Sequence, residues 1–148
     1  VKESRNKAIL IKELFYNNGF NVPATGPISG VYGSQRILNG KAKSPHYGID
    51  IALPEGDRVF APMDGIVLFT HNDLYFSGGT IIIGHGQGLT TSYLHLSEIS
   101  VKNNDLVKRG DLIGNVGSTG RATGPHLHWG AELNGKRLDP QYLKVFQK

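Results

Sequence analysis

The chain from Ile28 onward consists of short apolar runs, each bounded by Gly, Asn or Asp. Runs of this length, rich in Val, Ile, Thr and Tyr, are typical of β-strands, and their close spacing leaves no room for helices between them. The pattern predicts an all-β fold, mainly antiparallel, with at most one or two short helical turns. The expected strands are 48–52, 58–61, 65–70, 80–84, 90–94, 112–116 and 127–133.

The N-terminal residues follow a helical pattern instead. Apolar residues recur at helical spacing between Ser4 and Asn18, with Lys and Glu between them, and Gly19 is a suitable end for a helix. Prolines and glycines then break regular structure. We therefore expect residues 1–27 to form an N-terminal helix and linker, the remnant of a preceding region, and residues 28–148 to form a separate β domain.

Two segments, 56–67 and 104–114, resemble each other. Each carries an acidic turn, a short apolar strand, a second turn and another strand. They resemble the hammerhead turns of biotinyl, lipoyl and sugar-phosphotransferase carrier domains, which are barrel-sandwich β folds, and this likeness concerns fold rather than function. A carrier function would need a modifiable lysine at a hammerhead tip or a phosphorylatable histidine pair without Asp50. Lys108, next to Arg109, is a poor match.

The composition is that of one turn-rich globular domain. The 148 residues include 20 glycines and 7 prolines, and 39% of them are hydrophobic. The absence of cysteine excludes disulfides and thiolate metal sites. No apolar run approaches the roughly 20 residues that a membrane-spanning helix needs, so we expect no transmembrane segment in this fragment.

The net charge of +4 favours attraction to polyanions, which include nucleic acid, anionic lipid and cell-wall polymers. The basic residues are dispersed along the chain, with no basic helix and no RNA-binding aromatic motif. We therefore expect no nucleic-acid partner.

Two of the six histidines, His126 and His128, lie two residues apart and are flanked by Leu127 and Trp129. In a strand, alternate side chains point to the same face, so both imidazoles would face one space and their apolar neighbours the opposite side. Neutral imidazole is a zinc ligand and a proton acceptor near neutral pH. The pair could supply a metal ligand beside a base, although a surface pair without function would have the same sequence.

A second candidate pair lies upstream, where His46 precedes Asp50 by four residues. We expect a loop running into a strand, in which Gly48 lets the backbone fold so that both side chains can reach one ion. A catalytic zinc needs three protein ligands and one open position. His46, Asp50 and one histidine of the His126 and His128 pair would supply that number. The other histidine would then be a candidate base or transition-state stabiliser.

The remaining histidines lie in less specific surroundings. His95 ends an apolar strand before a polar turn, a position that suits function, although a structural histidine would look the same. His85 follows the run 81–83 in a glycine-flanked turn, where we expect a structural role or hydrogen bonding that supports the site from behind. His71 lies in a polar connection and is expected to be solvated.

Three motifs occur in an order that is specific to one family. His46-x-x-x-Asp50, Tyr-Leu-His-Leu-Ser at 93–97 and Gly-Pro-His-Leu-His-Trp at 124–129 resemble the motifs of lysostaphin-type (LytM-like) zinc metallopeptidases, which cut peptide crosslinks in bacterial peptidoglycan. Supporting similarity is found at 61–65 and 110–120.

The resemblance implies a Zn²⁺ ion bound by His46, Asp50 and His128, with His95 and His126 as the two non-ligand, catalytic histidines. Which of these two is the general base stays open. Together with the repeated segments, the resemblance implies a barrel-sandwich hybrid fold with a duplicated hybrid motif and one N-terminal helix. Residues 28–148 would then be the zinc metallopeptidase catalytic domain.

The chain departs from the family pattern at two points. Gly84 stands before His85, where members of the family often have an acidic or amide residue. The family's cleft tyrosine has no single match, and Tyr32, Tyr47 and Tyr75 are all candidates.

The favoured substrate is the D-alanyl–diaminopimelate crosslink between peptidoglycan stem peptides, with glycyl-glycine bridges as the alternative. The sequence at 33–36 and 39–46 resembles Gram-negative envelope members of the family more than it resembles glycyl-glycine lysins. Arg36 could bind a stem-peptide carboxylate as a bidentate donor. We expect a periplasmic or extracellular location in the bacterial cell envelope. A regulatory domain or propeptide could precede this fragment.

An alternative function belongs to a binding class: a catalytically inactive relative that binds and activates another cell-wall hydrolase. Such relatives typically lack one or more metal ligands, whereas all three are present in this sequence. The metal content of the purified protein discriminates between the two functions.

Overall fold

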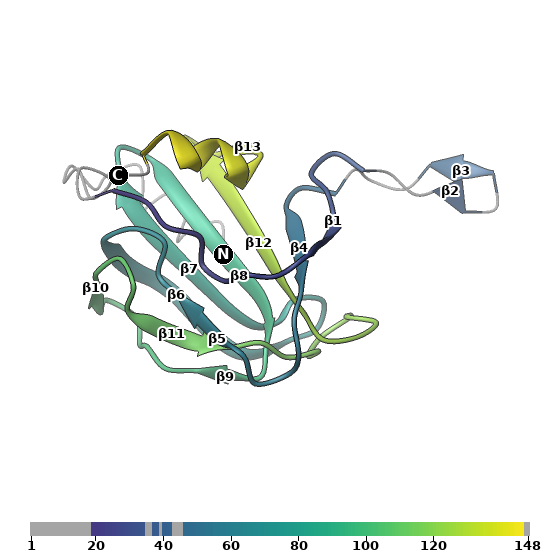
Figure 1. Ribbon diagram of the computed structural model, residues 1–148, viewed down its shortest axis with the longest axis horizontal. Helices are drawn as coiled ribbons and strands as arrows, with labels where there is room; N and C mark the ends of the chain where they lie inside the picture. The colour runs from purple at the N-terminus through teal and green to yellow at the C-terminus, as the bar shows by residue number, and fades with distance from the viewer. Residues whose placement is uncertain (1–18, 35–36, 39, 43–45, 147–148) are drawn as a thin grey trace.

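The computed structural model describes residues 19–34, 37–38, 40–42 and 46–146. These residues form an almost entirely β structure in which every strand pairing is antiparallel (Figure 1), as the sequence predicts. The helix expected between Ser4 and Asn18 lies outside the described residues. Within the described part of the chain, no helix has both the length and the apolar character needed to cross a membrane.

The larger sheet has eight strands, seven of them in the order β1-β4-β12-β8-β7-β6-β10. Strand β13 pairs with the end of β12 beyond the part that pairs with β4. Because β8 occupies the other edge of β12, β4 and β13 follow one another along the same edge. The strands are β1 (Ile28–Gly30), β4 (Ile49–Ala52), β6 (Gly65–Leu74), β7 (Gly78–Gly86), β8 (Leu89–Leu96), β10 (Leu106–Val107), β12 (His126–Leu133) and β13 (Lys136–Leu138).

The smaller sheet has three strands in the order β5-β11-β9, namely β5 (Arg58–Phe60), β11 (Leu112–Asn115) and β9 (Glu98–Ile99). Strands β2 (Ile37–Leu38) and β3 (Lys41–Ala42) pair only with each other, and Figure 1 shows this hairpin standing away from the two sheets. A short 3₁₀ helix, η2 (Pro140–Phe146), follows β13. It is one of the short helical turns that the sequence allows.

The two similar segments of the sequence pair with each other. The first strand of each segment joins the second strand of the other, so that β5 pairs with β11 and β10 pairs with β6. The turns are linked as well, because the Arg109 amide donates a hydrogen bond of 2.8 Å to Asp64 Oδ1. This reciprocal pairing explains why a repeated segment produces a two-sheet fold.

A continuous hydrophobic core fills the space between the sheets. Val59 and Ile113 of the smaller sheet are fully buried in one cluster with apolar residues of the larger sheet, which include Ile49 and Trp129. Alternation along β4 and β12 turns Ile49, Ile51, Leu127 and Trp129 toward this core. The residues between them therefore point to the outer face of the larger sheet.

Part of the segment before residue 28 belongs to the same core. The Phe20 ring is buried and stacks on Trp129, with 5.9 Å between ring centroids. The Phe60 amide donates to Pro23 O and the Asn21 amide donates to Pro62 O. Residues 20–23 are thus joined to the β fold, and the boundary between residues 27 and 28 stays a prediction.

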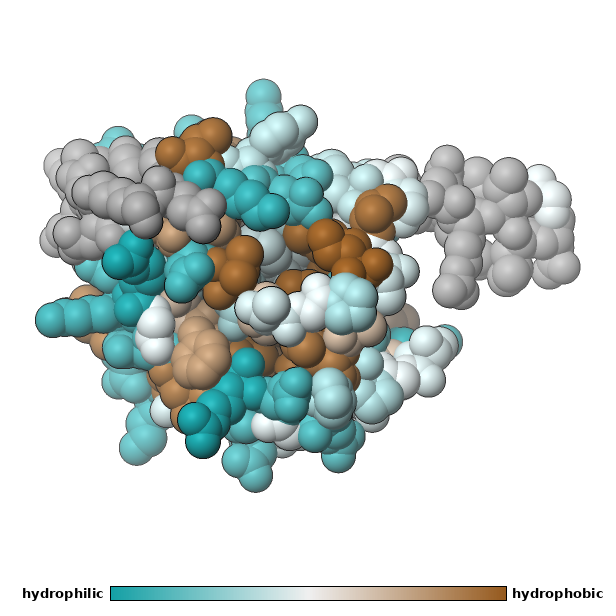
Figure 2. All heavy atoms as spheres, in the orientation of Figure 1, coloured by the Kyte–Doolittle hydropathy of each residue, from teal (hydrophilic) through white to brown (hydrophobic). Residues whose placement is uncertain are grey.

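The predicted strands are present, and the strands that sequence reasoning missed are the shortest ones. Strands β1, β2, β3, β9 and β13 have two or three residues each, too few for a period of two to be recognised. Figure 2 shows one face of the molecule. On this face the hydrophobic residues form several smaller areas, and hydrophilic residues surround them.

Candidate active site

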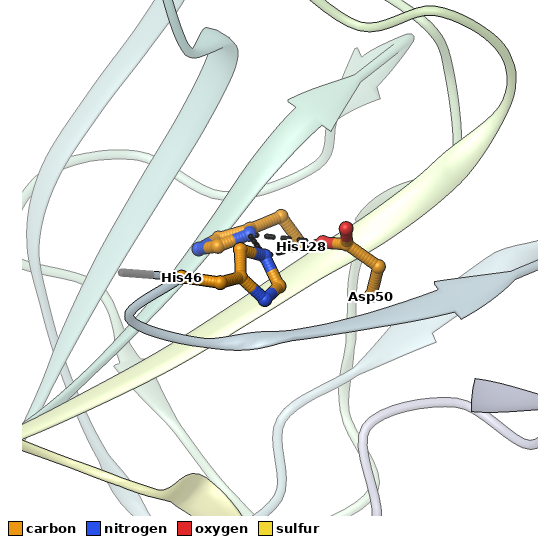
Figure 3. A group of neighbouring side chains, drawn as sticks. All are labelled: His46, Asp50 and His128. Atoms are coloured by element: carbon orange, nitrogen blue, oxygen red, sulfur yellow. Dashed lines mark hydrogen bonds and ion pairs between the residues drawn. The ribbon is translucent and has the colours of Figure 1, made fainter. Parts of the chain in front are cut away.

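Two neighbouring strands bring Asp50 and His128 together. In the pairing of β12 with β4, His128 lies directly opposite Asp50, and both side chains point to the outer face of the sheet. His128 Nδ1 lies 3.0 Å from Asp50 Oδ1. His46 reaches the same place from the loop before β4, with its Nε2 3.2 Å from both Asp50 Oδ1 and His128 Nδ1. Figure 3 shows the three side chains converging on one point.

The ring of His46 is oriented by the turn at 31–34. Its Nδ1 donates to Val31 O at 3.0 Å, which leaves the lone pair on Nε2 and directs it toward Asp50. The backbone of His46 pairs with the same turn, because its amide donates to Ser34 O and its carbonyl accepts from the Gly33 amide. These three hydrogen bonds fix the position of His46, which is not part of any strand.

Gly48 serves the site through its lack of a side chain, and this differs from the prediction. The backbone of Gly48 is not among those with positive φ, so glycine is not needed there for an unusual turn. A Cβ at this position would lie 2.6 Å from His128 Nε2 and 2.8 Å from Trp129 O. Gly48 therefore makes room for the His128 ring.

His126 and His95 lie beside the three converging residues. His126 shares the outer face with His128, and its Nε2 is 3.7 Å from Asp50 Oδ1. The His95 ring is 4.9 Å from the His126 ring between centroids and 6.4 Å from that of His128. All five predicted metal-binding and catalytic residues thus come together, and the division of roles among them stays a prediction.

His95 reaches this face through an unusual backbone conformation. Strand alternation would place it with Tyr93, which is fully buried on the core side. Instead His95 has a φ of 65°, in the left-handed region, and the pairing of β7 with β8 is irregular at this point. Its amide donates to Ser77 O at 2.8 Å. A strained conformation of this kind is typical of functional positions.

Backbone carbonyls also orient the two catalytic candidates. His126 Nδ1 donates to Gly124 O and His95 Nδ1 donates to Thr119 O, each at 2.8 Å. The proton of each neutral ring is therefore on Nδ1, and the Nε2 lone pair is available to a ligand. Each ring has one nitrogen fixed by the protein and one nitrogen open for chemistry.

Burial and charge shift two pKa values in the cluster. Burial lowers the pKa of His95, and the neighbouring rings of His126 and His128 lower it further, while the Thr119 carbonyl opposes the shift. For Asp50, burial raises the pKa, but the hydrogen bond with His128 and the charges of the surrounding histidines outweigh it and lower the pKa overall. The site therefore favours the ionised carboxylate of Asp50 and the neutral ring of His95.

The converging atoms fit a metal ion. One ligand atom each from His46, Asp50 and His128 lies within 4.8 Å of the other two. Two imidazole nitrogens and one carboxylate oxygen are a donor set that zinc accepts, and three ligands leave one coordination position open. The side chains are partly exposed, at 18 to 24%, so this position is accessible from outside.

The remaining candidates lie elsewhere. Arg36 lies outside the described residues. His85 is fully buried, with Nδ1 2.9 Å from Asp64 O and Nε2 2.7 Å from Thr91 Oγ1, which gives it a structural environment. His71 is exposed, as expected, and its Nδ1 accepts a hydrogen bond from the Asp73 amide.

A groove on the outer face extends from His128 along β12, and sequence reasoning missed most of its lining. It has a volume of about 220 Å³ and ends at Tyr47, Glu132 and Arg137. Among the candidate tyrosines, Tyr47 lines this groove, while Tyr32 packs edge-on against Tyr47 at 6.3 Å between centroids. The Asn134-Gly135 turn, with φ of 52° and 81°, is a hairpin signal that could have revealed β13 and its Arg137.

The fold and the site together define a class of protein. An antiparallel β-sandwich with a His–Asp–His cluster, two further oriented histidines and an adjoining groove has the parts of a metal-dependent hydrolase. Peptidase family M23 matches residues 44–140, and this chain belongs to that family. The predicted resemblance to lysostaphin-type metallopeptidases is thereby confirmed.

Relatives and solved structures agree with this assignment. Peptidoglycan DD-endopeptidase ShyA of Vibrio cholerae is 46% identical over 105 residues, which are 71% of this chain and 24% of that protein. The structure of a zinc containing peptidase from Vibrio cholerae matches with a TM-score of 0.76 and 34% identity, over 81% of this chain and 38% of that one.

The catalytic domain of the antimicrobial peptidase lysostaphin from Staphylococcus simulans is also similar. It matches with a TM-score of 0.70 and 32% identity, over 87% of this chain and 95% of that domain. By contrast, the chain spans about a quarter of the length of the curated relatives it matches.

Proposed function

We propose that this chain is a zinc-dependent endopeptidase that hydrolyses peptide crosslinks of bacterial peptidoglycan, with D-alanyl–diaminopimelate as the favoured bond. The observation that carries the proposal is the convergence of His46, Asp50 and His128, within 4.8 Å, beside the oriented rings of His126 and His95. Membership of family M23 and the likeness to a peptidoglycan DD-endopeptidase support the substrate class. Such a substrate implies a place in the cell envelope, periplasmic or extracellular.

In this proposal, residues 28–148 form the catalytic domain, and His46 Nε2, Asp50 Oδ1 and His128 Nδ1 hold the zinc ion. The donor set suits zinc better than magnesium or calcium, which prefer oxygen ligands alone. When bound, zinc supplies a Lewis acid that polarises the scissile carbonyl and makes water nucleophilic near neutral pH.

His126 and His95 carry out the proton chemistry in this proposal. Each has Nδ1 engaged with a backbone carbonyl, so Nε2 is the atom that faces the reacting groups. One Nε2 accepts a proton from the attacking water, a contribution of roughly 10² to 10⁴ in rate. The other ring, when protonated, donates a hydrogen bond to the carbonyl oxygen as negative charge develops there, which is worth roughly 10² to 10³.

Digestion of purified sacculi tests the proposal. Zinc-loaded protein should convert crosslinked dimers of diaminopimelate-type sacculi to monomers, and mass spectrometry of the released peptides identifies the bond. Cleavage restricted to glycine-bridged walls would contradict the favoured bond. A protein that holds no stoichiometric zinc and cleaves neither wall would instead be the inactive activator of another hydrolase.

A further inference from the structure

The groove beside the candidate metal site ends at a built arrangement of charged and aromatic side chains. Arg137 of β13 lies opposite Glu132 in the pairing with β12. Its Nε is 3.7 Å from Glu132 Oε1, and its guanidinium carbon lies 4.4 Å from the centre of the Tyr47 ring. All three residues line the groove, and so does His128.

The strand order explains why these residues meet. β4 and β13 follow one another along the same edge of β12, so Tyr47, just before β4, lies at the seam between them. Gly130 is opposite this seam, and a Cβ there would be 3.5 Å from Tyr47 O and 2.7 Å from Ser92 Oγ. The glycine keeps the floor of the groove open between His128 and Arg137.

The guanidinium of Arg137 is held on two sides by neighbouring side chains of the groove. The Tyr47 ring supports one of its faces, and Glu132 faces its Nε. Nη1 and Nη2 of Arg137 form no hydrogen bond with any residue in the described part of the chain, and about half of the side chain is exposed. A guanidinium held in this way has lost part of its rotational freedom before a ligand arrives, which favours bidentate binding of a carboxylate.

The distance along the sheet indicates where such a carboxylate lies on the substrate. Glu132 follows His128 by four residues on β12, which corresponds to about 13 Å. An extended peptide covers that distance in about four residues. A ligand with its reacting carbonyl at the metal site and a carboxylate a few residues away would fill the groove.

We infer that Arg137 binds a free carboxylate of the substrate peptide and thereby selects which crosslinks the groove accepts. This inference rests on the proposed endopeptidase function and specifies the substrate class further. A D-alanyl–diaminopimelate crosslink carries carboxylates on diaminopimelate and at a free peptide end, whereas a glycine bridge carries none along its length. Arg137 therefore favours the first bond over the second.

Three synthetic dimers test the inference with zinc-loaded protein. One has free carboxylates, one is amidated at the diaminopimelate carboxylate, and one is amidated at the free C-terminal alanine. For Arg137→Gln, kcat/KM on the free dimer should fall roughly tenfold, mainly through KM, because one charge-assisted pair is lost. On one of the amidated dimers the variant should match the wild type within about twofold, which identifies the carboxylate that Arg137 binds.

Two variants serve as controls. Arg137→Lys should restore only part of the loss, because an ammonium cannot make the bidentate pair. Lys136→Gln removes an exposed positive charge from the neighbouring position of β13, whose side chain points to the other face, and should leave all three rates unchanged. Zinc content and melting temperature should be the same in every variant.

Several results would overturn the inference. A loss of equal size on all three dimers would mean that Arg137 acts only by supporting Tyr47 and Glu132. A variant as active as the wild type on the free dimer would mean that Arg137 binds nothing. Both leave the endopeptidase function intact, whereas a wild-type protein that cleaves none of the dimers defeats the proposed function and this inference with it.

Discussion

Two clusters of hydrogen-bonded side chains lie on opposite faces of the same sheet: a core cluster around the single histidine His85, and an outer cluster that contains His46, His95, His126 and His128. They differ in how the ring nitrogens of their histidines are used. On the core face, His85 has both ring nitrogens engaged, with Asp64 O and with Thr91 Oγ1, and Thr91 Oγ1 lies 2.6 Å from the Tyr93 hydroxyl. On the outer face, His46, His95 and His126 each engage Nδ1 with a backbone carbonyl. Of these two clusters, only the outer one has ring nitrogens left for a ligand.

Burial separates the two clusters as well. His85 is fully enclosed, and burial lowers its pKa to about 4 despite the opposing effect of the Asp64 carbonyl. In the outer cluster, His95 is largely buried, but the rings of His46, His126 and His128 remain partly accessible and surround the Asp50 carboxylate. A fully satisfied buried histidine stabilises the fold, whereas a half-satisfied one at a groove can bind and react.

The largest effect should come from removing a metal-binding side chain of the outer cluster. His128→Ala or His46→Ala should abolish stoichiometric zinc and lower kcat/KM by at least about 10³, because the Lewis acid contributes several kcal/mol. Metal analysis and sacculus digestion measure the two effects. His71→Ala, an exposed histidine outside both clusters, should change neither.

The second effect concerns the two non-ligand histidines. His95→Ala and His126→Ala should retain zinc and lower kcat by roughly 10² to 10⁴, because each removes a proton acceptor or an oxyanion donor. Metal analysis with steady-state kinetics separates this result from ligand loss. If His126→Ala lost the metal and His128→Ala kept it, the roles within the pair would be reversed.

The core cluster should appear in the pH dependence of stability. His85 stays neutral in the folded protein down to about pH 4, whereas in the unfolded chain it gains a proton near pH 6.5. The unfolded state therefore binds more protons between these values, and His85 alone should lower the free energy of unfolding by roughly 3 kcal/mol as the pH falls from 7 to 4.

Urea unfolding with excess chelator, at pH 7 and pH 4, measures this change without metal release. His85→Gln should show a smaller fall with pH than the wild type. NMR titration of the wild-type imidazoles gives the same information without a substitution. A His85 ring that gains its proton near pH 6.5 in the folded protein would contradict the comparison of the two clusters.

The smallest effect should come from filling the space next to the His128 ring. In Gly48→Ala, the new Cβ would meet both His128 Nε2 and the Trp129 carbonyl, so the ring must move. Zinc affinity should fall about 10- to 100-fold, as it does when the support of a ligand is disturbed, and competition with a chromophoric chelator measures it. Gly124→Ala is the matched control, since a Cβ there would meet no atom within 4 Å. Equal zinc affinities in the two variants would contradict the close approach of residue 48 to the His128 ring.

Much of the fold could be predicted because strands repeat every two residues. Alternation along 127–133 placed Leu127 and Trp129 in the core and His126 and His128 on the opposite face, and the structure has this arrangement. The strands that were missed, such as β13, are too short for their period to be recognised. Their positions depend on pairing with distant segments, which the local sequence does not contain.

The site was predictable in its members and less so in its geometry. His46, Asp50 and His128 could be selected from residue type and family motifs, because few side chains bind zinc. The role of Gly48 was predicted wrongly. Backbone freedom and lack of space for a side chain both favour glycine, so the sequence could not distinguish between them. The way His95 reaches the outer face could not be predicted, because alternation places it in the core and a φ of 65° turns it outward.

The sequence by itself determined the β fold class, the two repeated segments and the residue types that can hold a metal. These follow from local periodicity and from the chemistry of single side chains. Only the tertiary structure decided which nitrogen of each histidine faces the site, which face His85 occupies and that Tyr47, Glu132 and Arg137 meet at the end of the groove. These depend on strand register and on contacts between residues far apart in the chain, so no local pattern contains them.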